Sequence, residues 1–147
     1  MAIYKHTQMG TLVLVVLGLG IALTVSILFM VQTDSERILV AAVTGLLLLC
    51  IFLFRTLNVS VDSEKVEVSF GPGAFRKRFL VADINSARAV GNSWYFGWGI
   101  RWIPNGWMYN VSGFDSVELD LKDNRKFRIG TDDPDNLLAA IQENTST

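Results

Sequence analysis

The sequence has little of the chemistry that most enzymes and metalloproteins use. It contains one cysteine and one histidine among 147 residues. Cys50 cannot form an internal disulfide, and it lies inside an apolar run where the expected role is that of a small apolar side chain. His6 lies near the N-terminus, far along the chain from every acidic residue, so neither a metal-ligand cluster nor a histidine–acid catalytic pair is predicted. We therefore expect no enzymatic activity, no metal and no cofactor.

Charge is also scarce. Only 18% of the residues are Asp, Glu, Lys or Arg, whereas an ordinary soluble domain has roughly 25%. Residues 56–147 hold 10 Lys and Arg against 12 Asp and Glu, so this part is near neutral. That balance argues against a nucleic-acid partner. The acidic group Asp132, Asp133 and Asp135 is better explained by the start of a helix than by a cation site.

Two long runs lack formal charge altogether. Residues 11–31 would span about 31 Å as a helix, which matches the hydrocarbon core of a bilayer. Residues 38–54 would span about 25 Å, and Arg37 and Arg55 at their ends can extend toward the headgroups. A cleaved signal peptide is the alternative for the first run and a buried core helix for the second. We predict instead a two-helix transmembrane hairpin within residues 1–55.

Small residues recur at four-residue spacing in both runs, and such stripes let helix backbones approach closely in lipid. We predict that the two stripes face each other, although small residues are also simply common in membrane helices. The predicted packing residues are Gly18, Ala22 and Ser26 in the first helix and Ala41 and Gly45 in the second.

The flanking charges predict the orientation of the hairpin. Lys5 precedes the first run, and Arg55 follows the second, with three further cations at residues 76–78. Arg37 in the connecting loop is accompanied by two acidic residues. The positive-inside rule then places both termini in the cytoplasm, in a multi-pass membrane protein.

After residue 55 the hydrophobic period changes from that of a helix to that of a strand. Alternating segments are separated by short polar turns, and one Asn-Gly pair is a strong hairpin signal. Asp133 can cap a helix that begins at Pro134 and ends near residue 144. We predict one domain over residues 56–147, with seven or eight short antiparallel strands and a C-terminal helix.

The segment GWGIRWIPNGWMYNVSG, residues 97–113, contains three of the four tryptophans. Because alternate side chains of a strand point in opposite directions, some of these aromatic rings must fill the core, which is our main interpretation. The aromatic residues of the preceding loop need not be buried. The alternative is a partner groove or an aromatic anchor at the membrane interface. Its candidate contact residues are Trp94, Tyr95, Phe96, Trp98 and Arg101.

Three consecutive cations, Arg76, Lys77 and Arg78, lie soon after the predicted membrane exit. They could contact anionic lipid headgroups, at about 1 kcal/mol per charge. They could equally be the charged edge of a strand that prevents unwanted pairing. Both interpretations stay open from the sequence.

The stretch GIRWIPNGWMYNVSGFDSVELDLKDNRKFRIGTDDPDNLLAAI, residues 99–141, resembles the last strands and helix of bacterial pleckstrin-homology-like domains. The shared features are a G-x-R segment, a glycine-punctuated aromatic hairpin, the letters VEL, a strand ending in IGTDDP and a final helix. One or two transmembrane helices often precede such domains, as predicted here. The resemblance implies a PH-like antiparallel barrel or sandwich of about seven strands with a C-terminal capping helix, at the bacterial inner (plasma) membrane.

Lipid-binding members of the wider superfamily hold phosphates with Lys and Arg between the first two strands. Here that loop contains Asp62 and Glu64, which would repel a phosphorylated headgroup. We therefore expect a non-enzymatic protein-interaction or scaffolding module at the cytoplasmic membrane face, and as the alternative an anionic-lipid-binding or membrane-sensing module. The expected partners are the lipid bilayer and other membrane or membrane-associated proteins, not nucleic acid.

Overall fold

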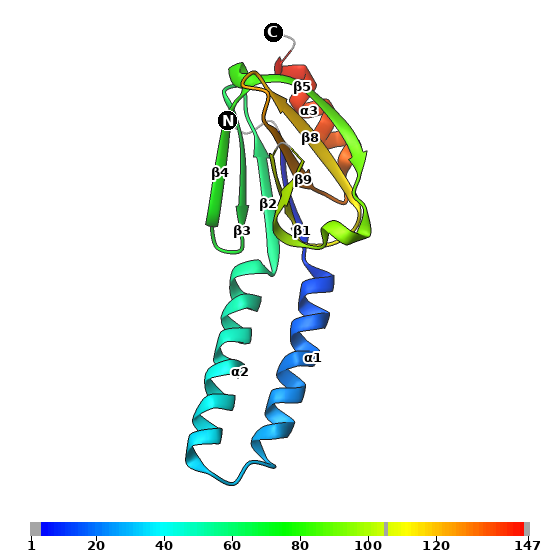
Figure 1. The fold of residues 1–147 in the computed structure, drawn as a ribbon. Helices are drawn as coiled ribbons and strands as arrows, with labels where there is room; N and C mark the ends of the chain where they lie inside the picture. Colours follow the sequence, from blue (N-terminus) through cyan, green and yellow to red (C-terminus); the bar gives the residue numbers. More distant parts are fainter. Residues whose placement is uncertain (1–3, 105, 146–147) are drawn as a thin grey trace.

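The computed structural model describes residues 4–104 and 106–145. Two helices, α1 (Thr11–Leu28) and α2 (Asp34–Phe54), extend side by side from a β-rich unit (Figure 1). Both are long and apolar enough to cross a membrane, and neither has a buried residue. α2 begins before the predicted residue 38 because Thr33 caps it, accepting a hydrogen bond from the backbone N–H of Glu36 at 3.4 Å.

The two helices meet along a different seam from the predicted one. The Thr44 hydroxyl donates a hydrogen bond to the Thr24 hydroxyl at 2.9 Å, and a Cβ added to Gly20 would lie 3.5 Å from the Leu47 side chain. A hydroxyl group among apolar side chains is stabilised by a hydrogen bond to another hydroxyl group. This bond explains why the two helices meet along Thr24 and Thr44. The predicted small residues do not face each other: Gly18 and Gly45 border open space, and Ala22, Ser26 and Ala41 are exposed.

The β-rich unit begins before the hairpin. Strand β1 (Tyr4–Met9) pairs antiparallel with β2 (Thr56–Val61), and the Gly10 N–H donates to the Arg55 carbonyl at 2.7 Å. The helical hairpin is therefore an insertion between two adjacent strands of one sheet. Residues 4–9, which we predicted to be part of the hairpin segment 1–55, belong to this sheet.

Two sheets of mostly antiparallel strands make up the unit. The first has the strand order β1-β2-β3-β4, with β3 at Lys65–Phe70 and β4 at Ala74–Leu80. The second has the order β5-β8-β9-β7-β6. Its strands are β5 (Ile84–Gly91), β6 (Gly99–Ile103), β7 (Gly106–Asn110), β8 (Asp115–Leu121) and β9 (Lys126–Gly130). Eight of the strands in the described residues, β2 to β9, lie within residues 56–147, in agreement with the seven or eight predicted there, and β1 is a ninth.

One strand pair departs from the predicted antiparallel order. β7 and β9 run parallel, from Gly106 opposite Lys126 to Tyr109 opposite Ile129. The chain leaving β7 does not turn back beside it, because β8 pairs with β5 on one side and β9 on the other. The β8–β9 hairpin then brings β9 alongside β7 in the same direction. The hydrophobic periodicity within each strand does not reveal such a crossover between strands.

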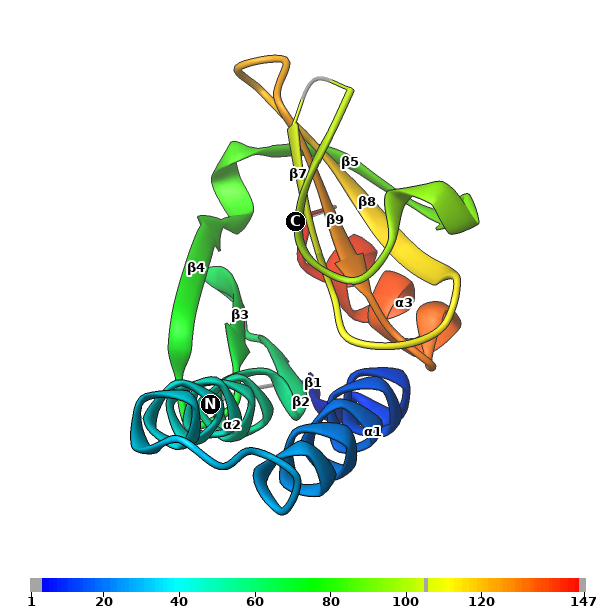
Figure 2. The same ribbon diagram turned by 60° about the horizontal axis from the view of Figure 1, so that its bottom comes forward.

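The core lies between the two sheets, and Figure 2 shows them as two diverging walls with α3 (Pro134–Thr145) against the β5–β8 wall. α3 begins at the predicted proline and buries Leu137, Ala140 and Ile141. The alternating side chains of β2, β3, β8 and β9 supply the rest of the core. The fully enclosed ones include Leu57, Val61, Val66, Val68, Phe70, Val117, Leu119 and Ile129.

The unit is closed on one side only. On the β1 side, the Tyr4 hydroxyl donates to the Asp133 carboxylate at 3.2 Å, and His6 lies 2.5 Å from the Asp132 carboxylate. On the other side, β4 and β6 are the edge strands of their sheets. The two sheets therefore form an open arrangement rather than a closed barrel.

Candidate functional site

An open slot runs between the edge strand β4 and the wall formed by β7 and β9. Its inner part has a volume of about 170 Å³ and is lined by Lys77, Ile100, Trp107, Tyr109 and Phe127. Its outer part, of about 490 Å³, shares Lys77, Trp107 and Phe127 with the inner part, so the two are continuous. We call both parts together the open slot.

The outer part of the open slot has a surplus of positive charge. Its lining contains the cations Lys77, Arg78, Lys122, Arg125 and Lys126 and the acids Asp83 and Asp123. Arg125 is paired with Asp123 at 2.5 Å. Among the described residues, no carboxylate lies within ion-pair distance of Lys77 or Lys122. The slot thus combines two unpaired ammonium groups with an aromatic floor.

Strand alternation divides the predicted basic patch between two faces of β4. Val68 pairs with Lys77, and the buried Phe79 lies two residues further along the same strand. Lys77 therefore points to the core side of the sheet, into the open slot. Arg76 and Arg78 point to the opposite side, where Glu67 lies 3.3 Å and 2.5 Å from them. The three cations do not form one surface.

The predicted aromatic contact set is also divided. Trp94 and Tyr95 are 77% and 67% exposed on the short helix η2 (Trp94–Phe96), which lies at the end of the unit nearest the helices (Figure 1). The Phe96 ring instead packs against the Arg128 guanidinium, 5.7 Å from the ring centre. Arg101 Nε donates to the Trp98 carbonyl at 2.9 Å, so these two residues form a separate pair.

The core-filling interpretation of residues 97–113 is correct only in part. The Tyr109 ring packs against the core, but Trp102 and Trp107 are 65% and 46% exposed and contact each other edge to face, with their ring centres 5.1 Å apart. Both rings point to the inner side of their sheet, where β4 does not cover them. Strand alternation predicts the side of the sheet on which Trp107 lies, but it could not predict that β4 leaves this side uncovered.

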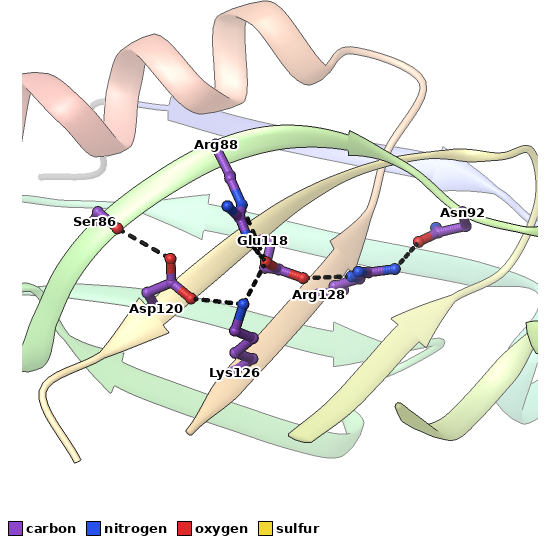
Figure 3. A network of polar contacts seen from close by, with 7 residues as sticks. All are labelled: Ser86, Arg88, Asn92, Glu118, Asp120, Lys126 and Arg128. Carbon is purple, nitrogen blue, oxygen red and sulfur yellow. Dashed lines mark hydrogen bonds and ion pairs between the residues drawn. The ribbon is translucent and has the colours of Figure 1, made fainter. Parts of the chain in front are cut away.

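A buried ionic network lies on the face of the second sheet that points away from the core (Figure 3). Glu118, only 1% exposed, pairs with Arg88, with Arg128 at 2.6 Å and with Lys126 at 3.3 Å. Arg128 also donates to the Asn92 side chain at 3.2 Å. These contacts join β5, β8 and β9, and they hold Lys126 at the rim of the open slot.

The same network makes the stability of the fold depend on pH. Burial would raise the pKa of Glu118, but the hydrogen bonds from Arg88, Arg128 and Lys126 outweigh it and lower the pKa from 4.5 to about 2. Ionised Glu118 therefore stabilises the folded state above about pH 4.5, and this contribution of about 3 kcal/mol is lost as the pH falls toward 2. Urea unfolding of the full-length protein in detergent should show that loss, and Glu118→Gln should show a smaller one.

Comparison with protein-family models, with curated proteins and with solved structures finds no match to the chain. Among the described residues, no group of three or more His, Cys, Asp or Glu side chains is arranged to hold a metal ion. The open slot offers non-covalent contacts: an unpaired strand edge, two free ammonium groups and the exposed ring of Trp107.

Proposed function

We propose that the protein is a non-enzymatic interaction module of the pleckstrin-homology-like kind, anchored in the bacterial inner membrane with both termini in the cytoplasm. The two long apolar helices support the anchoring, and the cations Lys5 and Arg55 at their shared end support the orientation. The strand-rich unit with a final helix supports the assignment of its kind. Because the hairpin is inserted between β1 and β2, two connections join the unit to the membrane: β1 leads into α1, and α2 leads into β2.

The observation that carries the proposal is the unpaired edge of β4, which lies across a basic slot from an exposed Trp107. An edge strand offers a row of free N–H and C=O groups to an added strand. Lys77 and Lys122 favour acidic side chains, and Trp107 offers the kind of aromatic surface that dominates binding energy in protein interfaces. The partner is therefore an extended protein segment that combines acidic residues with an apolar or aromatic one.

The structure favours this partner over a lipid bound by residues 76–78. Arg76 and Arg78 both pair with the single carboxylate of Glu67, and Lys77 points away from them into the slot. A flat membrane surface cannot reach a side chain in that position while it also contacts the two arginines.

Site-specific crosslinking tests the proposal. A photoreactive phenylalanine derivative in place of Trp107 should crosslink, in native membranes, to an acidic segment of another protein. Lys77→Glu should lower the yield about tenfold, which corresponds to about 1.4 kcal/mol of lost binding. Arg76→Glu makes the same charge change on the other face of the same strand and should leave the yield nearly unchanged. Sequencing of the crosslinked peptide identifies the segment.

Three results would contradict the proposal. The label at Trp107 could crosslink to lipid alone, or to a segment without acidic residues. Alternatively, Lys77→Glu and Arg76→Glu could lower the yield equally, which would mean that total charge rather than the slot decides binding.

A further inference from the structure

A second cavity lies at the junction of α1 and β6. It has a volume of about 600 Å³, and we call it the α1–β6 groove. One wall is the first two turns of α1, and the other is the chain from Gly97 to Arg101. Of the residues lining the open slot, only Ile100 also lines this groove. Its α1 wall consists of Leu12, Val13, Val16 and Leu17.

The groove is apolar except for one cation. Among the described residues that line it, Arg101 is the only charged one, and its guanidinium lies beside Gly97. Arg101 Nε donates its hydrogen bond to the Trp98 carbonyl. Among the described residues, no carboxylate lies within ion-pair distance of Arg101, so its terminal N–H groups have no acidic partner. A guanidinium in this state is suited to bind a phosphate with two hydrogen bonds.

The position of the groove selects its occupant. Its α1 wall begins one residue after the start of the apolar helix, so in the proposed topology this wall lies in the inner leaflet. The rim with Arg101 then lies at the depth of the headgroups, where Trp98 is also favourably placed. A groove that is continuous with the hydrocarbon and has one unmatched positive charge at the headgroup level is complementary to a single anionic lipid.

We propose that the α1–β6 groove binds one anionic phospholipid of the surrounding leaflet. One acyl chain lies along Leu12 and Val16, and the phosphate accepts hydrogen bonds from Arg101. The proposal rests on the membrane anchoring proposed above but not on the protein partner of the open slot. It makes Arg101, rather than residues 76–78, the lipid-recognising cation of the chain.

Quenching of Trp98 by brominated lipids tests the site. Full-length protein that retains Trp98, with the other three tryptophans replaced by Phe, is reconstituted in vesicles with dibrominated phosphatidylglycerol or dibrominated phosphatidylcholine. We expect an approximately fivefold higher apparent affinity for phosphatidylglycerol. Arg101→Gln should abolish this preference, and Arg37→Gln, at the opposite end of the hairpin, should preserve it.

A variant that fills the groove, compared with a control variant that does not, tests the position of the acyl chain. Val16 and Val15 are similarly exposed, at 58% and 56%, but only Val16 lines the groove. Val16→Phe should weaken quenching by both lipids, and Val15→Phe should not. Native mass spectrometry of the protein with all its tryptophans adds an independent measurement: it should show one retained phosphatidylglycerol, and none after Arg101→Gln.

Several outcomes would overturn the proposal. Equal quenching by both lipids, a preference that survives Arg101→Gln, or identical effects of the two valine variants would each exclude the lipid site while leaving the anchoring intact. The absence of quenching by either lipid would overturn the anchoring as well.

Discussion

Glu118→Gln is expected to lower the free energy of unfolding of the β-rich unit by about 3 kcal/mol at neutral pH. The amide keeps the shape of the side chain but removes the negative charge that three cations share. Arg88 is more than half exposed and can turn into water, whereas Arg128 is only 19% exposed and is left without a counter-charge. The loss therefore comes mainly from an uncompensated guanidinium within the sheet.

Urea titration of full-length protein in detergent measures this loss. All four tryptophans lie between residues 94 and 107, so their fluorescence follows the β-rich unit and not the helices. Asp120→Asn is the matched control, because Asp120 lies on the same strand and also pairs with Lys126, at 3.5 Å, but is 27% exposed. We expect it to cost less than about 1 kcal/mol. If the two variants are equally stable, the buried network does not carry the stability assigned to it.

A double variant distinguishes the charge effect from a packing effect. Replacing both Glu118 and Arg128 with Leu removes the buried charge together with its least exposed partner. Such replacements of buried ion pairs are often neutral or stabilising. We expect this variant to be more stable than Glu118→Gln, since the only guanidinium that loses its partner is that of Arg88, which is more than half exposed and can turn into water.

The local elements of the fold could be predicted from the sequence, but their long-range pairings could not. The strand alternation that begins after residue 55 and the start of α3 at Pro134 were each predicted and observed, because neighbouring residues determine them. β1 was missed because six residues of mixed polarity form a strand only when β2 returns beside them after the helical hairpin. The same return of the chain brings His6 next to Asp132, although the two residues are 126 positions apart in the sequence.

The candidate site shows the same limit. The sequence indicated exposed aromatic and basic residues, but it grouped them by their neighbours along the chain. The structure instead joins Lys77 with Trp107 in the open slot, whereas Trp98 and Arg101, which the sequence had placed in one set, stay together beside α1. Lys122 was not considered at all, because a lysine in a polar turn has no distinguishing local signal. The grouping of Lys77 with Trp107 depends on the open edge of β4, which the sequence does not reveal.

Gly106→Ala is expected to cost at least about 3 kcal/mol of stability. Gly106 begins the parallel pairing of β7 with β9, opposite Lys126, and an added Cβ would overlap the backbone carbonyl of that lysine. No side-chain rotation can relieve contact with a backbone carbonyl, so β7 must move away from β9. That movement would uncover Phe127 and would also displace Trp107 from the open slot.

Gly91→Ala provides the matched control, since Gly91 also lies in a strand of the second sheet but has open space where its Cβ would be. Its stability should change by less than about 1 kcal/mol. Because the slot depends on the β7–β9 pairing, Gly106→Ala should also abolish crosslinking from position 107, whereas Gly91→Ala should preserve it. A Gly106→Ala protein that unfolds at the wild-type urea concentration would show that β7 does not approach β9 this closely, and the geometry of the open slot would then have to be revised.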